Sequence, residues 1–256
     1  MALVHNVIIR GMNSIYLQCE YVTNRMAPSF LLYCQFWTEF IQSHHGCEEV
    51  AYFPIIEEAA GVEGLSEGNL EQHDAFLAGL QEFEKYVYHV PPSQYDGRKI
   101  IELLDSFATT LQSHLTDEVI WILALSRFPQ LDLAAIDDYH KNYVIARQNP
   151  TRTVPFLLTN HDVYYESGIH RNWPMLDGNS IREGTVSRLS ARLRDHWVRY
   201  ICTLVHKSVW KYSPCTVAGR PKALEGLKGE QTRSLRTVDR IGRQAQRESG
   251  SKDCPQ

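Results

Sequence analysis

Apolar residues recur every three or four positions along the first half of the chain, which is the spacing of helices that each bury one stripe. This pattern predicts four long helices, over residues 2–19, 28–60, 69–88 and 97–126. Proline and glycine mark their limits: Pro28 suits a first turn, and Gly61 ends the second helix. Helices joined by short, turn-rich connections pack most simply as neighbours of opposite direction. We therefore predict an all-α fold, an antiparallel up-down-up-down four-helix bundle over residues 1–128.

The pattern loosens after the predicted bundle. A short helix is expected over 133–146, then an irregular stretch rich in Asn, Gly and Pro, then an additional C-terminal helical segment over 184–211. We expect the extension formed by residues 129–218 to pack on the bundle. Residues 219–256 are polar and poor in aromatic and aliphatic side chains, so they bury too little apolar surface to fold, and a disordered tail is expected there.

Composition and charge exclude several classes of function. The 256 residues are 43% hydrophobic and 22% charged with a net charge of −4, which is ordinary for a globular protein. No basic stripe with interleaved aromatics occurs in the first 200 residues, so a nucleic-acid partner is not expected. No apolar run reaches the length of a membrane span, and no signal peptide is evident, so we expect a cytoplasmic protein. The six cysteines lack CxxC pairs and are expected to be reduced packing residues.

Polar residues interrupt the apolar stripes of all four predicted helices. They are His5, His44, Glu48, His73, His114 and Glu118. A buried carboxylate costs several kcal/mol unless it is paired or coordinated, and here imidazoles and carboxylates would meet in one interior. A metal centre satisfies all of these groups together. The other histidines, His140 among them, are expected to be structural or exposed.

Two of the predicted helices repeat the same pair of residue types. His44 with Glu48, and His114 with Glu118, are each four residues apart, so both members of a pair project from one helix face. Imidazole and carboxylate without thiolate suit iron, manganese or zinc, and paired carboxylates in a bundle interior favour two iron or manganese ions. Helical phase prefers His44 and Glu48 to the neighbouring pair His45 and Glu49, and both pairs remain candidates.

The order of these residues resembles the hemerythrin-like cation-binding (HHE) domain family. The elements are His5, then His44-His45-x-x-Glu48-Glu49 followed by Phe53-Pro54, then His73, then His114-Leu115-x-x-Glu118. Residues 154–162 and 210–221 resemble segments that accompany the domain in fungal members. The resemblance implies that His5, His44, Glu48, His73, His114 and Glu118 are metal ligands. It makes His45 a further candidate ligand, and it implies that Glu48 and Glu118 bridge the ions or each cap one. Helical phase leaves Glu49 as a reserve candidate.

This chain departs from the oxygen-carrying members of that family at two positions. Those members place a second histidine four residues after the one on the third helix, where this chain has Leu77. They also place an aspartate five residues after the fourth-helix histidine, where this chain has Val119, with Glu118 one residue earlier. Simple reversible oxygen carriage is therefore disfavoured, and a centre with an open coordination position is expected.

Three functions follow as hypotheses. The first is a non-haem di-iron protein that binds or senses iron, dioxygen, nitric oxide or peroxide. The second is a di-iron oxidoreductase acting on peroxide or nitric oxide. The third is a metal-free helical scaffold that recruits an unidentified protein partner. Because the sequence shows no separate acid–base residue, it leaves open whether the protein is an enzyme.

Overall fold

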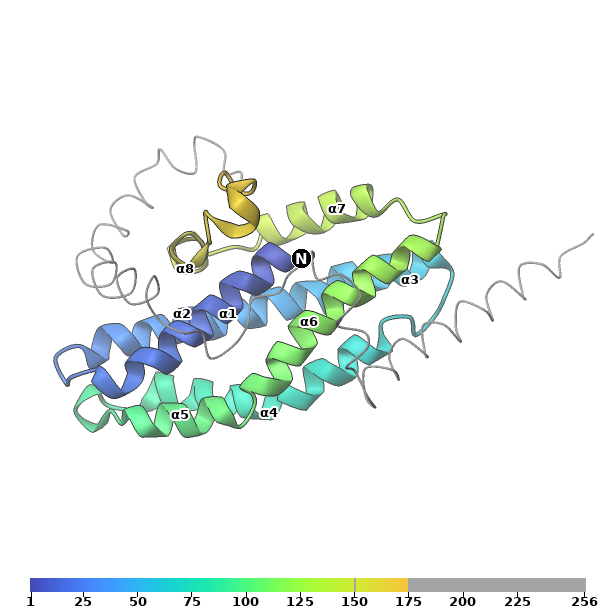
Figure 1. Cartoon of the computed structure of the whole chain (residues 1–256). Helices are drawn as coiled ribbons and strands as arrows, with labels where there is room; N and C mark the ends of the chain where they lie inside the picture. Colours follow the sequence, from blue (N-terminus) through green and yellow to red (C-terminus); the bar gives the residue numbers. More distant parts are fainter. Residues whose placement is uncertain (150, 175–256) are drawn as a thin grey trace, which may run out of the picture.

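The computed structural model describes residues 1–149 and 151–174, and all regular secondary structure in this part of the chain is helical, without strands (Figure 1). The all-α prediction is therefore confirmed. The helical segment predicted at 184–211 and the tail predicted at 219–256 lie outside the described residues. None of the described helices combines the length and apolarity that crossing a bilayer demands.

Four long helices surround a common interior: α1 (Ala2–Gln18), α2 (Ala27–Cys47), α4 (Glu67–His89) and α6 (Ala108–Ala124). Helix α1 contacts α2 and α6, and α4 also contacts α2 and α6, so each helix has two neighbours (Figure 1). Short 3-10 turns occur at the helix ends and connections, at Cys19–Tyr21, Pro92–Gln94, Leu125–Arg127 and Tyr165–Gly168.

The second predicted helix changes its winding where the candidate ligands lie. Helix α2 passes into a π-helical turn at Glu48–Tyr52 and then into α3 (Phe53–Ala60). A π-turn inserts an extra residue per turn and is frequent at functional sites. Gly61 follows α3 with a φ of 67°, the left-handed conformation of a helix C-cap that glycine adopts without a steric penalty.

The prediction of one helix over 97–126 was wrong, because the segment is divided into α5 (Gly97–Asp105) and α6. Phe107 lies between them with a φ of −138°, which is not helical. The ring of Phe107 is buried and packs near the rings of Trp37 and Phe83, with centroid distances of 6.1 and 6.2 Å. Burial of this aromatic ring therefore accounts for the break.

Two further helices, α7 (Leu133–Ile145) and α8 (Thr153–Asn160), pack on the four long ones. Helix α7 contacts α2 and the π-turn, and α8 contacts α1 and α2 (Figure 1). Helix α8 lies where we expected irregular chain, which is a correction. Its anchor is Phe156, whose ring lies 5.4 Å from the ring of Tyr33 and 5.4 Å from that of Phe40. The division of the chain at residue 128 stays a prediction.

A polar layer separates two apolar clusters in the interior. The larger cluster contains Trp37, Phe83 and Leu111, and the smaller contains Phe53 and Trp121. The smaller cluster lies beyond the polar layer toward the N-terminal ends of α1 and α4 and the C-terminal ends of α2 and α6. N-terminal ends of two helices and C-terminal ends of the other two thus lie at the same side of the layer, which supports the predicted antiparallel order. The polar layer itself contains the candidate ligands.

Candidate metal centre

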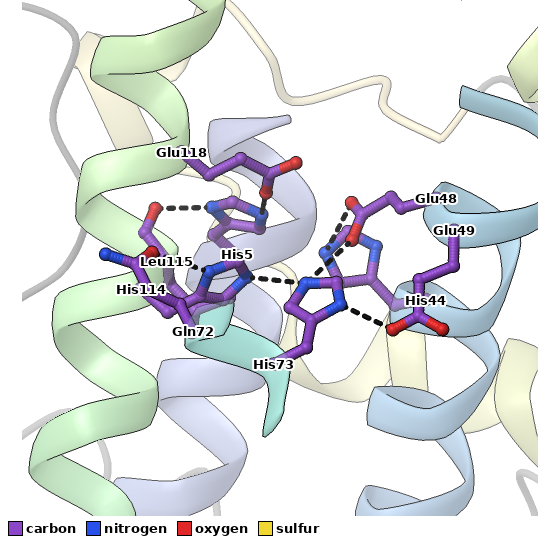
Figure 2. A network of polar contacts seen from close by, with 9 residues as sticks. All are labelled: His5, His44, Glu48, Glu49, Gln72, His73, His114, Leu115 and Glu118. Atoms are coloured by element: carbon purple, nitrogen blue, oxygen red, sulfur yellow. Dashed lines mark hydrogen bonds and ion pairs between the residues drawn. The ribbon is translucent and has the colours of Figure 1, made fainter. Parts of the chain in front are cut away.

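All seven residues predicted as ligands point into this polar layer. His5 comes from α1, His44 and His45 from the last turn of α2, Glu48 from the start of the π-turn, His73 from α4, and His114 and Glu118 from α6. Their exposed fractions are between 0% and 7%. Figure 2 shows six of the seven converging from the surrounding helices.

The donor atoms fall into two groups, each small enough for one ion. In the first group the donors of His45, Glu48, His73 and His114 all lie within 4.8 Å of one another, and in the second so do those of His5, His44, Glu48 and Glu118. Only Glu48 belongs to both groups. The arrangement therefore offers two adjacent ion sites that share one carboxylate.

The position of Glu48 on its helix explains why it can serve both groups. It follows His44 by four residues and His45 by three, so its side chain lies beside both imidazoles on the inner face. One carboxylate oxygen is 3.1 Å from Nε2 of His44, and the other is 3.9 Å from Nε2 of His73 (Figure 2). A carboxylate with one oxygen toward each group has the geometry of a bridge between two ions.

The hydrogen bonds of His5 determine which of its nitrogens is available. Nδ1 is 2.7 Å from the carbonyl oxygen of Leu115, which can only accept, so Nδ1 carries the proton. In the neutral ring Nε2 then has a lone pair, and it lies 3.0 Å from Oε2 of Glu118. In that state Nε2 of His5 and Oε2 of Glu118 are both acceptors, and a cation that binds both atoms makes their close approach favourable.

The same reasoning applies to His73 and His114. Nδ1 of His73 is 2.6 Å from the carboxylate of Glu49, and Nδ1 of His114 is 3.1 Å from Oε1 of Gln72. The amide of Gln72 is oriented by Asp117, which accepts a bond of 3.1 Å from its Nε2. Both imidazoles therefore carry their proton on Nδ1.

The two remaining nitrogens, Nε2 of His73 and Nε2 of His114, lie 3.1 Å apart. When both rings are neutral, both of these nitrogens present lone pairs, and neither can donate a hydrogen bond to the other. Two ligands about 2.1 Å from one ion at a right angle are separated by about 3 Å. The spacing is thus that of two ligands of one metal ion.

Several donor atoms in the layer are buried without a hydrogen-bond partner among the described residues. They include Nε2 of His44 and of His45, and both oxygens of Glu48 and of Glu118. Unsatisfied buried polar atoms are rare in native structures and each calls for an explanation. Their chemistry, imidazole nitrogen and carboxylate oxygen, fits two divalent metal ions.

Burial sets the protonation of these groups. It lowers the pKa of His44 and His45 well below the usual range and that of His114 to about 3, so these rings are neutral at pH 7. Burial, followed by the nearby Glu118, raises the pKa of Glu48. Burial is the largest effect on the pKa of Glu118 and raises it, but the interactions with His5, His114 and His73 together outweigh burial and leave this pKa below its usual value. Neutral imidazoles are the form that binds metal.

Two expectations about individual positions change. His44 and His45 do not compete for one place, because both are buried and each belongs to a different group. Glu49 belongs to neither group; its side chain is 45% exposed, and it contacts Nδ1 of His73. Leu77 is 40% exposed, so position 77 faces away from the layer, and the third imidazole of the first group is His45.

Sequence reasoning missed the outer partners of the histidines: Gln72, Asp117 and the carbonyl of Leu115. A ligating histidine usually uses its second nitrogen to donate to such a group, which fixes the ring. A weak signal was present, since each of these residues is a chain neighbour of a candidate ligand. Gln72 precedes His73, and Asp117 precedes Glu118.

Aromatic rings enclose the layer. Phe76 lies 5.0 Å from His45 and 5.6 Å from His114 between ring centroids, and Phe53 lies 5.8 Å from His73. These rings exclude water and lower the local dielectric constant, which strengthens electrostatic interactions at the centre.

The comparisons with known proteins agree with this geometry. Residues 2–119 match the hemerythrin HHE cation-binding domain. The chain is also similar to the dimeric xanthone biosynthesis cluster protein R11 of Cryptosporiopsis sp. (strain 8999), with 30% identity over 225 residues, covering 88% of this chain and 80% of that protein. No solved structure matches the chain significantly. The chain therefore belongs to the hemerythrin HHE cation-binding domain family.

Proposed function

We propose that this protein binds two iron ions in the polar layer, with Glu48 as the bridging carboxylate. The observation that carries the proposal is the pair of facing nitrogens on His73 and His114, each with its other nitrogen already donating. A cation removes the repulsion between the two lone pairs. One ion would be held by His45, Glu48, His73 and His114, and the other by His5, His44, Glu48 and Glu118.

The donor set favours iron over other metals by chemical type. Five imidazoles and two carboxylates, without thiolate, suit iron, manganese or zinc. Carboxylate-bridged pairs in a four-helix interior are typical of two iron or two manganese ions. Iron is therefore the metal proposed, and manganese and zinc are the alternatives that an elemental analysis distinguishes.

Each ion would receive four side chains, one of them shared. Iron commonly takes five or six ligands, so this set leaves a position for a small exogenous molecule. Dioxygen, nitric oxide and peroxide are small enough for a position enclosed by Phe53, Phe76 and the helices. We infer that the protein binds or senses one of these ligands, because burial of the centre favours binding over rapid exchange of substrates.

An oxidoreductase is the second candidate, and one observation favours it. The similar protein from Cryptosporiopsis is named for a dimeric xanthone biosynthesis cluster, which places that protein in a biosynthetic setting. In such a setting the same pair of ions would turn over peroxide, dioxygen or nitric oxide rather than only bind it. Steady-state consumption of peroxide by the iron-loaded protein separates the two candidates.

The first test is the iron content of protein purified without a metal-binding tag and reconstituted with ferrous iron, together with its visible spectrum before and after exposure to air. About two irons per chain are expected. His114→Ala should bind substantially less iron, whereas the matched variant His89→Ala should bind as much as wild type, because His89 is exposed at the end of α4. If folded wild-type protein takes up no metal, the proposal is wrong, and the metal-free helical scaffold is the hypothesis that remains.

A further inference from the structure

His140 is a buried histidine that neither metal group uses. It lies on α7, outside the residues that match the HHE domain, and its exposed fraction is 8%. Its Nε2 atom is buried without a hydrogen-bond partner among the described residues. An unsatisfied buried polar atom destabilises a folded protein, so this nitrogen points to a hydrogen-bond partner that the described residues do not supply.

The surroundings of His140 connect it to the candidate metal centre. Helix α7 packs against α2 and against the π-turn that begins with Glu48. The ring of His140 lies against that of Tyr52, the last residue of the π-turn, with centroids 4.7 Å apart and planes inclined by 34°. Tyr52 is itself buried, with an exposed fraction of 5%. The imidazole is therefore held beside the turn that supplies the bridging carboxylate.

Electrostatic interactions indicate which half of the centre His140 faces. Burial lowers the pKa of His140, while the charges of Asp137 and Glu118 act in the opposite direction. His140 is in turn one of the residues that lower the pKa of His44, after burial itself and two other histidines. Glu118 and His44 both belong to the group that contains His5. The electrostatic interactions of His140 with the candidate ligands are therefore with members of that group.

We propose that His140 donates a hydrogen bond from Nε2 to a small ligand bound on one of the two ions, and that Tyr52 holds its ring in place. The ion concerned is the one held by His5, His44 and Glu118. This inference rests on the proposed function, because it requires an ion at that site. The ligand is a small anion or diatomic molecule with an oxygen or nitrogen acceptor.

His140 is distinct from the ligands themselves. It is not a member of either group whose donor atoms lie within 4.8 Å of one another. His140 therefore has the role of a hydrogen-bond donor to a molecule bound on the ion and not that of a ligand of the ion. The role predicts that His140 changes the affinity of the centre for an exogenous ligand but leaves the amount of bound iron unchanged.

Azide is the probe for the test, because it binds to open positions on iron and produces a visible charge-transfer band. Iron-loaded wild type, His140→Phe and His140→Gln are titrated with azide, and iron per chain and melting temperature are measured on the same samples. Phenylalanine keeps a ring against Tyr52 but removes the donor, whereas glutamine restores an N–H. His89→Phe is the matched control at an exposed histidine.

His140→Phe is expected to keep its iron and to bind azide about tenfold more weakly, as the loss of one hydrogen bond to an anion implies. His140→Gln should recover part of the affinity, and His89→Phe should equal wild type. If His140→Phe does not fold, His140→Leu gives the same comparison. An unchanged dissociation constant, loss of iron, or failure of iron-loaded wild type to bind azide would each overturn the inference. Wild type that binds no iron would instead overturn the proposed function, on which the inference rests.

Discussion

His73 and His114 bring their Nε2 atoms to within 3.1 Å of each other, although each ring already donates a hydrogen bond from Nδ1. When both rings are neutral, their two facing lone pairs repel each other, and the low dielectric constant of the interior strengthens that repulsion. The metal-free protein therefore keeps an unfavourable contact at its centre. Such a contact is typical of a binding site, where stability is given up for function.

This contact gives a prediction about stability. Because His73→Leu removes one of the two lone pairs, metal-free His73→Leu should melt at the same temperature as metal-free wild type or higher. Iron should raise the melting temperature of wild type by roughly 5–15 °C when it is present at 100 to 1,000 times its dissociation constant. It should raise that of His73→Leu much less. Thermal melts with and without iron measure all four values, and a metal-free variant several degrees below wild type would contradict the argument.

Glu49 provides a prediction about metal affinity. Its carboxylate contacts Nδ1 of His73 at 2.6 Å, so it fixes the ring and strengthens Nε2 as a ligand. Glu49→Gln should weaken metal binding about 10- to 100-fold, as removal of such an outer partner typically does. Competition with a chelator of known affinity measures the change. Glu58→Gln, an exposed glutamate on α3, is the control. Equal affinities for the two variants would show that Glu49 has no part in the site.

The sequence predicted the helices and the inward direction of the candidate ligands because both follow from helical periodicity. The ends of α1 and α4 lie within two residues of the expected positions. Periodicity could not predict the break at Phe107 or the helix around Phe156, since both depend on rings from distant parts of the chain. Tertiary packing decided these two local structures.

The same limit applies within the candidate site. Helical phase treated His44 and His45 as alternatives because it considered one helix at a time. The interior is wide enough for both, and each faces a different set of partners. The outer partners Gln72 and Asp117 were also beyond reach, because a hydrogen bond between α4 and α6 depends on how the two helices are aligned. Helix alignment is a property of the packed core and not of either segment.

Protonation in the layer gives a pH prediction. Burial lowers the pKa of His44, His45 and His114, so these rings have no proton to lose at pH 7. Burial raises the pKa of Glu48, whose carboxyl must lose its proton to bind metal. Metal binding at pH 7 should therefore release at most about one proton from these four groups, and affinity should fall as the pH decreases.

Calorimetry of zinc or ferrous iron binding in buffers of different ionisation enthalpy measures this number. Glu48→Gln, which has no proton to release, should give a heat that does not depend on the buffer. Release of three or more protons by wild type would show that the histidines are charged before the metal binds, contrary to the effect of burial on their pKa values.

Alanine substitutions at two glycines test how closely α8 packs on the long helices. A Cβ atom at Gly11 would lie 2.6 Å from Cζ of Phe156 and 2.7 Å from Cδ1 of Trp37, so Gly11→Ala should lower the free energy of unfolding by about 1–3 kcal/mol through overpacking. Gly46 is the matched control, because it also lies in a long helix but a Cβ atom there meets nothing within 4 Å. Gly46→Ala should raise the free energy by about 0.5–1 kcal/mol, since alanine loses less backbone entropy in a helix. Urea denaturation of both variants measures the difference.

If Gly11→Ala were as stable as Gly46→Ala, Phe156 would not pack against α1, and the contact between α8 and the long helices would have to be looser than the structure indicates.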